Sequence, residues 1–334
     1  MNTQQLLFNL SDAVSIGNIT DAANIAFDEL SKYADTTQNG NEVIGTIKGE
    51  SDYTLMVEAH VDEVGFVVTD VDNQGFLTVK NCGGMDLRML PSKLVTVHGK
   101  QRVNGVFCST PPHLSSGSKE YDDISEIKID TLLGEGAKEI IGVGDFVTFN
   151  TKATTLQNAR VTGKSFDNRA GVCTVLLLAQ KLSGKKLPFN VVFAITDMEE
   201  LGCRGAKTKA FEISPDEAIV LDVSFADGPD VPSGDCGCLG KGAMIGISPI
   251  LDKAISKKLI SVAEENNIDY QTEVMGGRTG TNSDVISISK SGVKTGLVSI
   301  PLRNMHTDVE VVDLNDIENV CNLIEVYILK GGNA

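Results

Sequence analysis

The sequence predicts an α/β fold in which helices sandwich a mainly parallel, mixed sheet, with an inserted all-β module of barrel or PDZ-like type. Before residue 63 and after residue 155, helical apolar spacing alternates with short apolar runs, which is typical of a parallel sheet covered by helices. Between these parts the helical spacing disappears and short strand patterns follow one another. We therefore predict a discontinuous domain, residues 1–62 with 155–334, and an inserted domain, residues 63–154.

The first segment of the larger domain is predicted to contain two helices followed by two strands. "QQLLFNLSDAV" and "DAANIAFDELSKYA" have apolar residues at helical spacing, whereas "NEVIGTIKG" is typical of a strand or hairpin. "LMVEAH" (55–60) is an apolar run with the length of a buried strand.

The inserted domain is predicted to consist of strands only. "GFVVTDVDNQGFLTVK" predicts a hairpin with "DNQG" at its tip, and "KLVTVHG", "RVNGVFC" and "DFVTFN" predict further strands. No convincing long helix interrupts them. We expect this domain to supply no catalytic group and no metal ligand, and we interpret its histidines, His98 and His113, as structural.

The second segment of the larger domain returns to strands and helices in alternation. An apolar helix is predicted at 169–183, followed by strands at 189–196, 217–224 and 294–301. Asp252 is placed to cap the helix in "DKAISKKLISVAEENN". The last helix has a stripe of apolar residues that we expect to be buried: Leu314, Ile317, Cys321, Ile324 and Ile328.

The composition indicates a globular protein and argues against two classes of partner. Hydrophobic residues make up 41% and charged residues 22% of the 334 residues, which are ordinary globular values. The net charge of −16 argues against a nucleic-acid partner, because binding to phosphates requires clustered Lys and Arg side chains. No apolar run approaches the roughly 20 residues that cross a bilayer, so we expect no membrane span.

We expect a cytoplasmic location with reduced cysteines. The N-terminal "MNTQQLLFNLSDA" has neither the basic start nor the long apolar core of a secretory signal. The seven cysteines are scattered, and the only close pair, "CGC" at 236–238, is too tight for a CxxC redox or zinc motif.

Polar side chains with metal-binding chemistry recur where predicted strands end. In open α/β sheets, ligands bind outside the carboxyl ends of the strands, so these side chains are expected to meet. One further acid, in "GKSFDNRAG", directly precedes a predicted helix. The candidate residues are His60, Asp62, Asp167, Glu199, Glu200, Asp222 and His306.

Each candidate has an ordinary structural explanation when it is taken alone. Asp167 fits a helix N-cap, Asp222 a turn after a strand, and His60 a hydrogen-bonded core histidine. Their convergence favours a functional site, because unpaired acids buried together cost several kcal/mol each, and divalent cations compensate for that cost.

Two histidines with several carboxylates suit a pair of divalent ions such as zinc, cobalt or manganese, whereas calcium or magnesium would favour oxygen ligands alone. Five candidate ligands and one additional glutamate provide what a dinuclear centre needs, including a base beside the attacking water. One of the adjacent glutamates, Glu199 and Glu200, would bind metal while the other moves a proton.

At these residues the sequence resembles the M42 metallopeptidases, the group of glutamyl and deblocking aminopeptidases that form tetrahedral particles. The matching segments run from residue 59 to 320: "AHVDEVGF", "GKSFDNRAGV", "TDMEELGCRGA", "IVLDVS" and "GLVSIPLRNMHTDVEVVDLNDIENV". The resemblance implies a mixed α/β peptidase domain with an inserted β domain used in subunit assembly, and dimers that build a hollow particle of twelve subunits.

The resemblance also implies a role for each candidate residue. Asp167 would bridge two metal ions, zinc or cobalt with manganese as the alternative. His60 and Asp222 would complete one metal site, and Glu200 and His306 the other. Glu199 would be the general base, and Asp62 would orient the His60 imidazole.

Three segments depart from the family's usual pattern. Residues 15–20, "SIGNIT", lack its common Ser-Gly-x-Glu sequence. Asn282 and Ser283 stand where an Asp-Ala pair is frequent, and Asp308 stands where Pro or another residue is more usual. None of these changes removes a ligand. The second and third lie near the expected substrate side and therefore concern specificity.

The expected function is a cytoplasmic, metal-dependent aminopeptidase that hydrolyses N-terminal residues from peptides and assembles as a homo-oligomer. One alternative is a related metal-dependent amidase or deacylase that acts on acylated amino acids. Another is a non-catalytic assembly protein with a structural metal site, although such a protein would have no need of Glu199. Acidic, aliphatic and basic N-terminal preferences are all compatible with the sequence.

Overall fold

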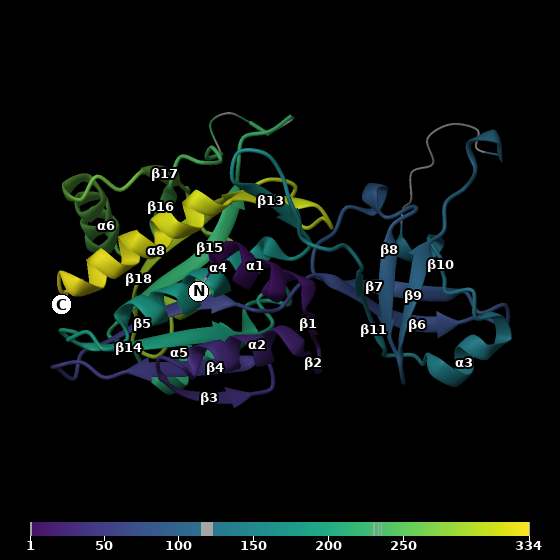
Figure 1. Ribbon diagram of the computed structural model, residues 1–334, viewed down its shortest axis with the longest axis horizontal. Coiled ribbons are helices and arrows are strands. Elements are labelled where there is room, and N and C mark those ends of the chain that lie inside the picture. Colours follow the sequence, from purple (N-terminus) through teal and green to yellow (C-terminus); the bar gives the residue numbers. More distant parts are fainter. Residues whose placement is uncertain (1, 115–122, 230, 233, 235, 334) are drawn as a thin grey trace.

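The computed structural model describes residues 2–114, 123–229, 231–232, 234 and 236–333. Figure 1 shows two lobes, a helix-covered sheet at which both chain ends lie and a β-barrel beside it. In the described part of the chain, none of the helices combines the length and the apolar character needed to cross a bilayer.

The larger lobe is built on a mixed sheet of eight strands, as the sequence predicts. Its four central strands, in the order β18-β15-β5-β14, are parallel, whereas β4 and β3 continue the sheet antiparallel beyond β14. At the other edge β16 is antiparallel to β18, and β17 is parallel to β16. The strands are β3 (Asp35–Asn39), β4 (Glu42–Ile47), β5 (Thr54–His60), β14 (Asn190–Thr196), β15 (Glu217–Phe225), β16 (Ala243–Ile247), β17 (Tyr270–Val274) and β18 (Lys294–Leu302).

Helices cover both faces of this sheet because its central strands are apolar on both sides. In β5, Leu55 and Val57 pack into the larger core cluster, whereas Met56 between them packs into the cluster on the other face. Five helices contribute to the larger cluster: α1 (Thr3–Asp12), α2 (Asp21–Leu30), α4 (Phe166–Leu182), α6 (Lys253–Glu265) and α8 (Leu314–Leu329). The opposite face is covered by α5 (Arg204–Ile213) and α7 (Ser283–Ile286).

The predicted helix signals are confirmed at two places. The Asp252 side chain caps α6 by accepting a hydrogen bond from the backbone N–H of Ala254 at 2.8 Å. On α8 the predicted stripe is buried from Ile317 to Ile328, although Leu314 is only partly buried.

Several short elements are not among the sequence predictions. The helix α5 has the sequence "RGAKTKAFEI", whose polar character hides its helical spacing, and β17 is a half-exposed edge strand. Two small sheets were not predicted either, because one has strands of only two residues and the other pairs segments that are far apart in the sequence. They are β1 (Ser15–Ile16) with β2 (Ile19–Thr20), and β12 (Thr154–Thr155), β13 (Arg160–Gly163) and β19 (Glu310–Asp313).

The second lobe is a closed antiparallel barrel with the strand order β10-β7-β6-β11-β8-β9. Its core contains three phenylalanines in edge-to-face contact, Phe66 with Phe107 and Phe149. The strands are β6 (Gly65–Val71), β7 (Leu77–Cys82), β8 (Leu94–His98), β9 (Arg102–Phe107), β10 (Ile129–Asp130) and β11 (Phe146–Phe149). Short helices lie between them: η1 (Leu87–Met89), η2 (Pro112–Leu114), η3 (Ile124–Glu126), η4 (Gly134–Gly136) and α3 (Ala137–Ile140).

The barrel strands fall inside the predicted inserted segment, residues 63–154. The inserted all-β architecture is therefore present, while the division into two domains at these boundaries stays a prediction.

A buried ion cluster joins the segment after β5 to the start of α4. Glu63, Lys164 and Arg169 are 3%, 4% and 0% exposed. Glu63 pairs with Lys164, and its Oε1 lies 3.3 Å from Nη2 of Arg169. Arg169 also donates to the backbone carbonyl oxygens of Leu10 and Ala13 at 2.6 and 3.2 Å. These contacts connect two segments that carry candidate site residues.

Replacing Glu63 with alanine should lower the free energy of unfolding by about 3–5 kcal/mol, because two buried cations lose the carboxylate with which they pair. Urea unfolding followed by circular dichroism, with chelator present so that metal loss does not contribute, measures this change. Glu50→Ala is the matched control, because Glu50 and its partner Lys186 are 68% and 93% exposed. Equal unfolding midpoints for the two variants would contradict the role of the cluster.

Candidate metal centre

The central parallel strands end along one edge of the sheet, and six of the seven candidate residues lie at that edge. His60 is the last residue of β5, Asp62 follows that strand, and Asp222 lies near the end of β15. Glu199 and Glu200 follow β14, and His306 follows β18. Because parallel strands end at the same edge, side chains that are far apart in the sequence meet there.

Strand alternation aims His60 and Asp222 at the same face. Val220 is paired with Glu58 in the β15–β5 register. Asp222 and His60, each two residues later on its strand, therefore lie beside each other on the same face. Val220 belongs to the cluster under α5 and α7, and Asp222 therefore points to that side.

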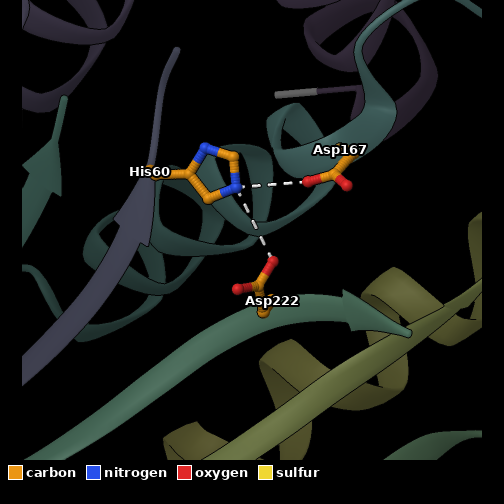
Figure 2. Close-up of side chains that lie close together, drawn as sticks. All are labelled: His60, Asp167 and Asp222. Atoms are coloured by element: carbon orange, nitrogen blue, oxygen red, sulfur yellow. Dashed lines mark hydrogen bonds and ion pairs between the residues drawn. The ribbon is translucent and has the colours of Figure 1, made fainter. Parts of the chain in front are cut away.

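The first group of potential ligands consists of His60, Asp167 and Asp222 (Figure 2). The Nε2 atom of His60 lies 3.1 Å from Oδ1 of Asp167 and 3.8 Å from Oδ1 of Asp222. Asp167 and Asn168 have non-helical backbone angles, and the peptide bond between them is cis. The regular part of α4 therefore begins after Asn168.

The second group consists of Asp167, Glu200 and His306. The Nε2 atom of His306 lies 3.4 Å from Oδ2 of Asp167 and 3.3 Å from Oε1 of Glu200. One oxygen of Asp167 therefore faces His60 and the other faces His306. Glu199 lies in a third overlapping group with His60 and Glu200.

Asp62 contacts the imidazole of His60 and the backbone of Glu199 and Glu200. Its Oδ1 is 3.2 Å from Nδ1 of His60, the imidazole nitrogen turned away from Asp167. The same carboxylate accepts hydrogen bonds from the backbone N–H groups of Glu199 and Glu200 at 3.0 and 3.1 Å. Asp62 thus lies against the imidazole and accepts hydrogen bonds from the turn that carries both glutamates.

Glu310 makes an equivalent contact on the other side, and the sequence did not reveal it. This side chain is 1% exposed and accepts from the backbone N–H of Asp167 at 3.0 Å and from that of His306 at 2.8 Å. Its only signal in the sequence is its place four residues after His306, in "MHTDVE". The pairing of β19 with β13, with Glu310 opposite Gly163, brings it to Asp167.

The pKa values of the site show that negative charge is in excess there. Burial raises the pKa of Asp222 well above its usual range, and the charge of Asp167 adds to this effect. Burial and the neighbouring carboxylates raise the pKa of Glu199 to about 7, although His60 opposes the change. Burial alone would lower the pKa of His306, but hydrogen bonds with Asp167 and Glu200 raise it to about 11. Added positive charge would therefore be stabilised at this place.

The donor set fits divalent metal ions. Two imidazole nitrogens and several carboxylate oxygens form three overlapping groups, in each of which the potential ligand atoms lie within 4.8 Å of one another. Mixed nitrogen and oxygen donors suit zinc, cobalt or manganese better than calcium or magnesium. His98 and His113 belong to none of the groups found among the described residues.

A cavity of about 650 Å³ opens over these groups. Its far wall is formed by residues from β15 to β17 and the segment after β17, including Phe225, Met244, Glu273 and Met275. Asn282 and Asp308, two of the departures from the family pattern, do not line it. Asn282 instead donates to buried Glu58 at 2.7 Å, and Asp308 accepts from Lys93 and Thr151 at 2.6 and 2.9 Å.

Comparison with known proteins agrees with this geometry. The M42 glutamyl aminopeptidase family matches residues 40–323. The lysyl aminopeptidase of Pyrococcus furiosus is 29% identical over 294 residues, which cover 86% of this chain and 84% of that protein.

Two solved structures share the whole architecture. An aminopeptidase from the archaeon Desulfurococcus kamchatkensis superposes with a TM-score of 0.92 at 31% identity, covering 98% of this chain and 95% of that one. The TET1 peptidase of Pyrococcus horikoshii, which can assemble into a tetrahedron or a large octahedral shell, has a TM-score of 0.86 at 29% identity, with 98% and 100% covered. This chain therefore belongs to the M42 peptidase family and is an aminopeptidase, a hydrolase that acts on peptides.

Proposed function

We propose that the enzyme hydrolyses N-terminal residues from peptides with a dinuclear metal centre and a glutamate general base. The observation that carries this proposal is the position of Asp167, whose two oxygens face two separate imidazoles at 3.1 and 3.4 Å. Asp167 would bridge two ions. His60 and Asp222 would hold one of them, and Glu200 and His306 the other.

Bound divalent ions would polarise the scissile carbonyl group and lower the pKa of the attacking water. Glu199 lines the cavity, and the only hydrogen bond of its carboxylate within the described chain is a long one, 3.5 Å, from the thiol of Cys203. The side chain is therefore available to take a proton from water and to pass it to the leaving amine. Asp62 keeps both His60 and the backbone of Glu199 in place during these steps.

The ions would be zinc or cobalt, with manganese as the alternative. The substrates would be peptides with a free N-terminal amine, which distinguishes this proposal from an amidase that acts on acylated amino acids. A cytoplasmic location stays a prediction from the sequence.

We also propose that the chain forms a homo-oligomer, with dimers that assemble into a tetrahedral dodecamer. The similar TET1 peptidase can assemble into a tetrahedron. The barrel protrudes from the sheet lobe (Figure 1), and its segment exposes the large apolar side chains of Leu94, Leu114, Leu132 and Val143. Burial of such apolar side chains in a subunit contact would be favourable, so these four are candidates for contact residues. The inserted segment, residues 63–154, would therefore serve assembly.

Removal of metal should abolish hydrolysis of an aminoacyl-p-nitroanilide, because the carbonyl group and the attacking water lose their activation. After exhaustive chelation, zinc, cobalt and manganese are added back in turn, and metal content is measured by elemental analysis. We expect about two ions per subunit at full activity. Peptides with acetylated N-termini serve as the control and should not be cleaved. Full activity without detectable metal would refute the proposal.

The adjacent glutamates should fail in different ways when each is changed to glutamine. Glu199→Gln should keep both ions and bind substrate, while turnover falls by roughly 10² to 10⁴, because the base can no longer accept a proton. Glu200→Gln should mainly weaken metal binding, and excess metal should partly restore its activity.

Metal content and turnover are measured on both variants. If Glu199→Gln loses metal whereas Glu200→Gln keeps it, the two roles are exchanged. Two fully active variants would refute both assignments.

Charged residues on the barrel should disrupt assembly without affecting the chemistry. In Leu132→Asp/Val143→Asp, a desolvated apolar contact would become an unpaired buried charge, so particle mass by light scattering should fall. The metal content of this variant should not change. The variants His98→Ala and His113→Ala should also keep the metal content of the wild type. An unchanged particle mass, or loss of metal from either histidine variant, would contradict the assignment of the barrel to assembly.

A further inference from the structure

Among the described residues that line the cavity, one charged side chain lies outside the candidate metal centre. Among the described lining residues, the far wall consists of apolar and neutral polar residues apart from Glu273 on β17. Neither lysine nor arginine occurs among the described residues that line the cavity. The wall that would receive the substrate's first side chain is therefore acidic and has no basic counterpart in the part that the structure describes.

Two serines of the central sheet hold the Glu273 carboxylate. The hydroxyl of Ser224 donates to Oε1, and the hydroxyl of Ser299 donates to Oε2 at 3.0 Å. Ser224 lies two residues after Asp222 on β15, and Ser299 is paired with Asp222 in the β15–β18 register. The carboxylate is thus fixed next to the strand that carries a candidate metal ligand.

Glu273 has no cationic partner among the residues that the structure describes. Both of its oxygens accept hydrogen bonds from neutral hydroxyls. In the described part of the chain, no lysine, arginine or histidine forms an ion pair with it. Burial raises the pKa of Glu273, and the two serine hydroxyls oppose this change. A cationic group that entered the cavity would stabilise the ionised carboxylate at a partly desolvated position.

The neighbouring wall suits the stem of a long basic side chain. Met244, Met275 and Phe225 also line the cavity, and Met244 is paired with Ser299, which donates to Glu273. A chain of methylene groups could pack on such apolar side chains while its charged end reaches the carboxylate. An acidic side chain would meet Glu273 in addition to the carboxylates of the metal centre, and mutual repulsion would disfavour it.

We propose that Glu273 determines specificity by selecting substrates whose N-terminal residue is cationic, lysine or arginine, over isosteric apolar and acidic residues. This proposal rests on the proposed aminopeptidase function and adds the substrate class to it. Glu273 would contact the side chain of the first residue and take no part in proton transfer.

The test compares lysine with norleucine, which has the same side chain without the terminal amine. Lysyl- and norleucyl-p-nitroanilide are assayed with the metal-loaded wild type and with Glu273→Gln, which keeps the size of the side chain. The amide oxygen can accept from one serine, and the NH2 group can donate to the hydroxyl oxygen of the other. The ratio of kcat/KM for the lysyl over the norleucyl substrate should fall by about 10- to 100-fold, as expected when one member of a partly desolvated charge pair is neutralised. The binding of L-lysine and L-norleucine, measured by calorimetry on the same proteins, should show the same loss of preference.

Asp269→Asn is the matched control. Asp269 is exposed, directly precedes β17 and does not line the cavity, so this variant removes the same charge without changing the wall. Its lysyl-to-norleucyl ratio should equal that of the wild type.

The outcomes separate this inference from the proposed function. Peptide cleavage without a preference for lysine, a ratio that Glu273→Gln leaves unchanged, or a preference of the wild type for glutamyl substrates would overturn the inference and leave the aminopeptidase standing. Absence of hydrolysis, combined with lysine binding that Glu273→Gln abolishes, would overturn the proposed function and support the cation site.

Discussion

The gathering of carboxylates around two imidazoles is the constraint on which the rest of the structure depends. Asp167, Glu200 and Asp222 converge on His60 and His306 with separations of 3.1 to 3.8 Å. The carboxylates also approach one another, because the potential ligand atoms of each group lie within 4.8 Å. Like charges at such a separation, largely removed from water, repel one another strongly. The protein therefore has to hold their backbone rigidly, and positive charge is stabilised where they meet.

Two carboxylates that do not line the cavity provide that rigidity. Asp62 binds the N–H groups of Glu199 and Glu200, and Glu310 binds those of Asp167 and His306. Each carboxylate accepts two backbone hydrogen bonds, one at each oxygen. Asp62 thereby connects the segment after β5 to the turn after β14, and Glu310 connects β19 to the segments of Asp167 and His306. Through these hydrogen bonds to the backbone, the potential ligands are held in position by the fold itself.

The barrel lobe is also connected to the site, although it contributes none of the candidate ligands. Asp308, two residues after His306, accepts from Lys93 and Thr151, which lie beside barrel strands. A surface pair of Arg102 with Asp21 adds a second connection between the lobes. If the barrel serves assembly as proposed, contacts between subunits would act on a segment directly joined to a candidate metal ligand, His306.

The sequence by itself determined the fold class, the principal strands and helices, and the candidate residues. Apolar runs such as "LMVEAH" and "FNVVFAIT" mark buried strands, and polar residues at their ends must gather when the strands are parallel. The M42 resemblance is likewise carried by residues within these segments. Apolar periodicity is sufficient to mark buried elements, and the alternation of strands with helices is sufficient to indicate a mainly parallel sheet.

Only the tertiary structure decided which groups support the site and shape its pocket. Glu310 reaches Asp167 through the pairing of β19 with β13, and Glu273 reaches the cavity from an edge strand through serines of two other strands. Neither residue stands at the end of an apolar run. Their positions depend on pairing between segments that are far apart in the sequence, so the residues next to Glu310 and Glu273 in the sequence do not predict their partners.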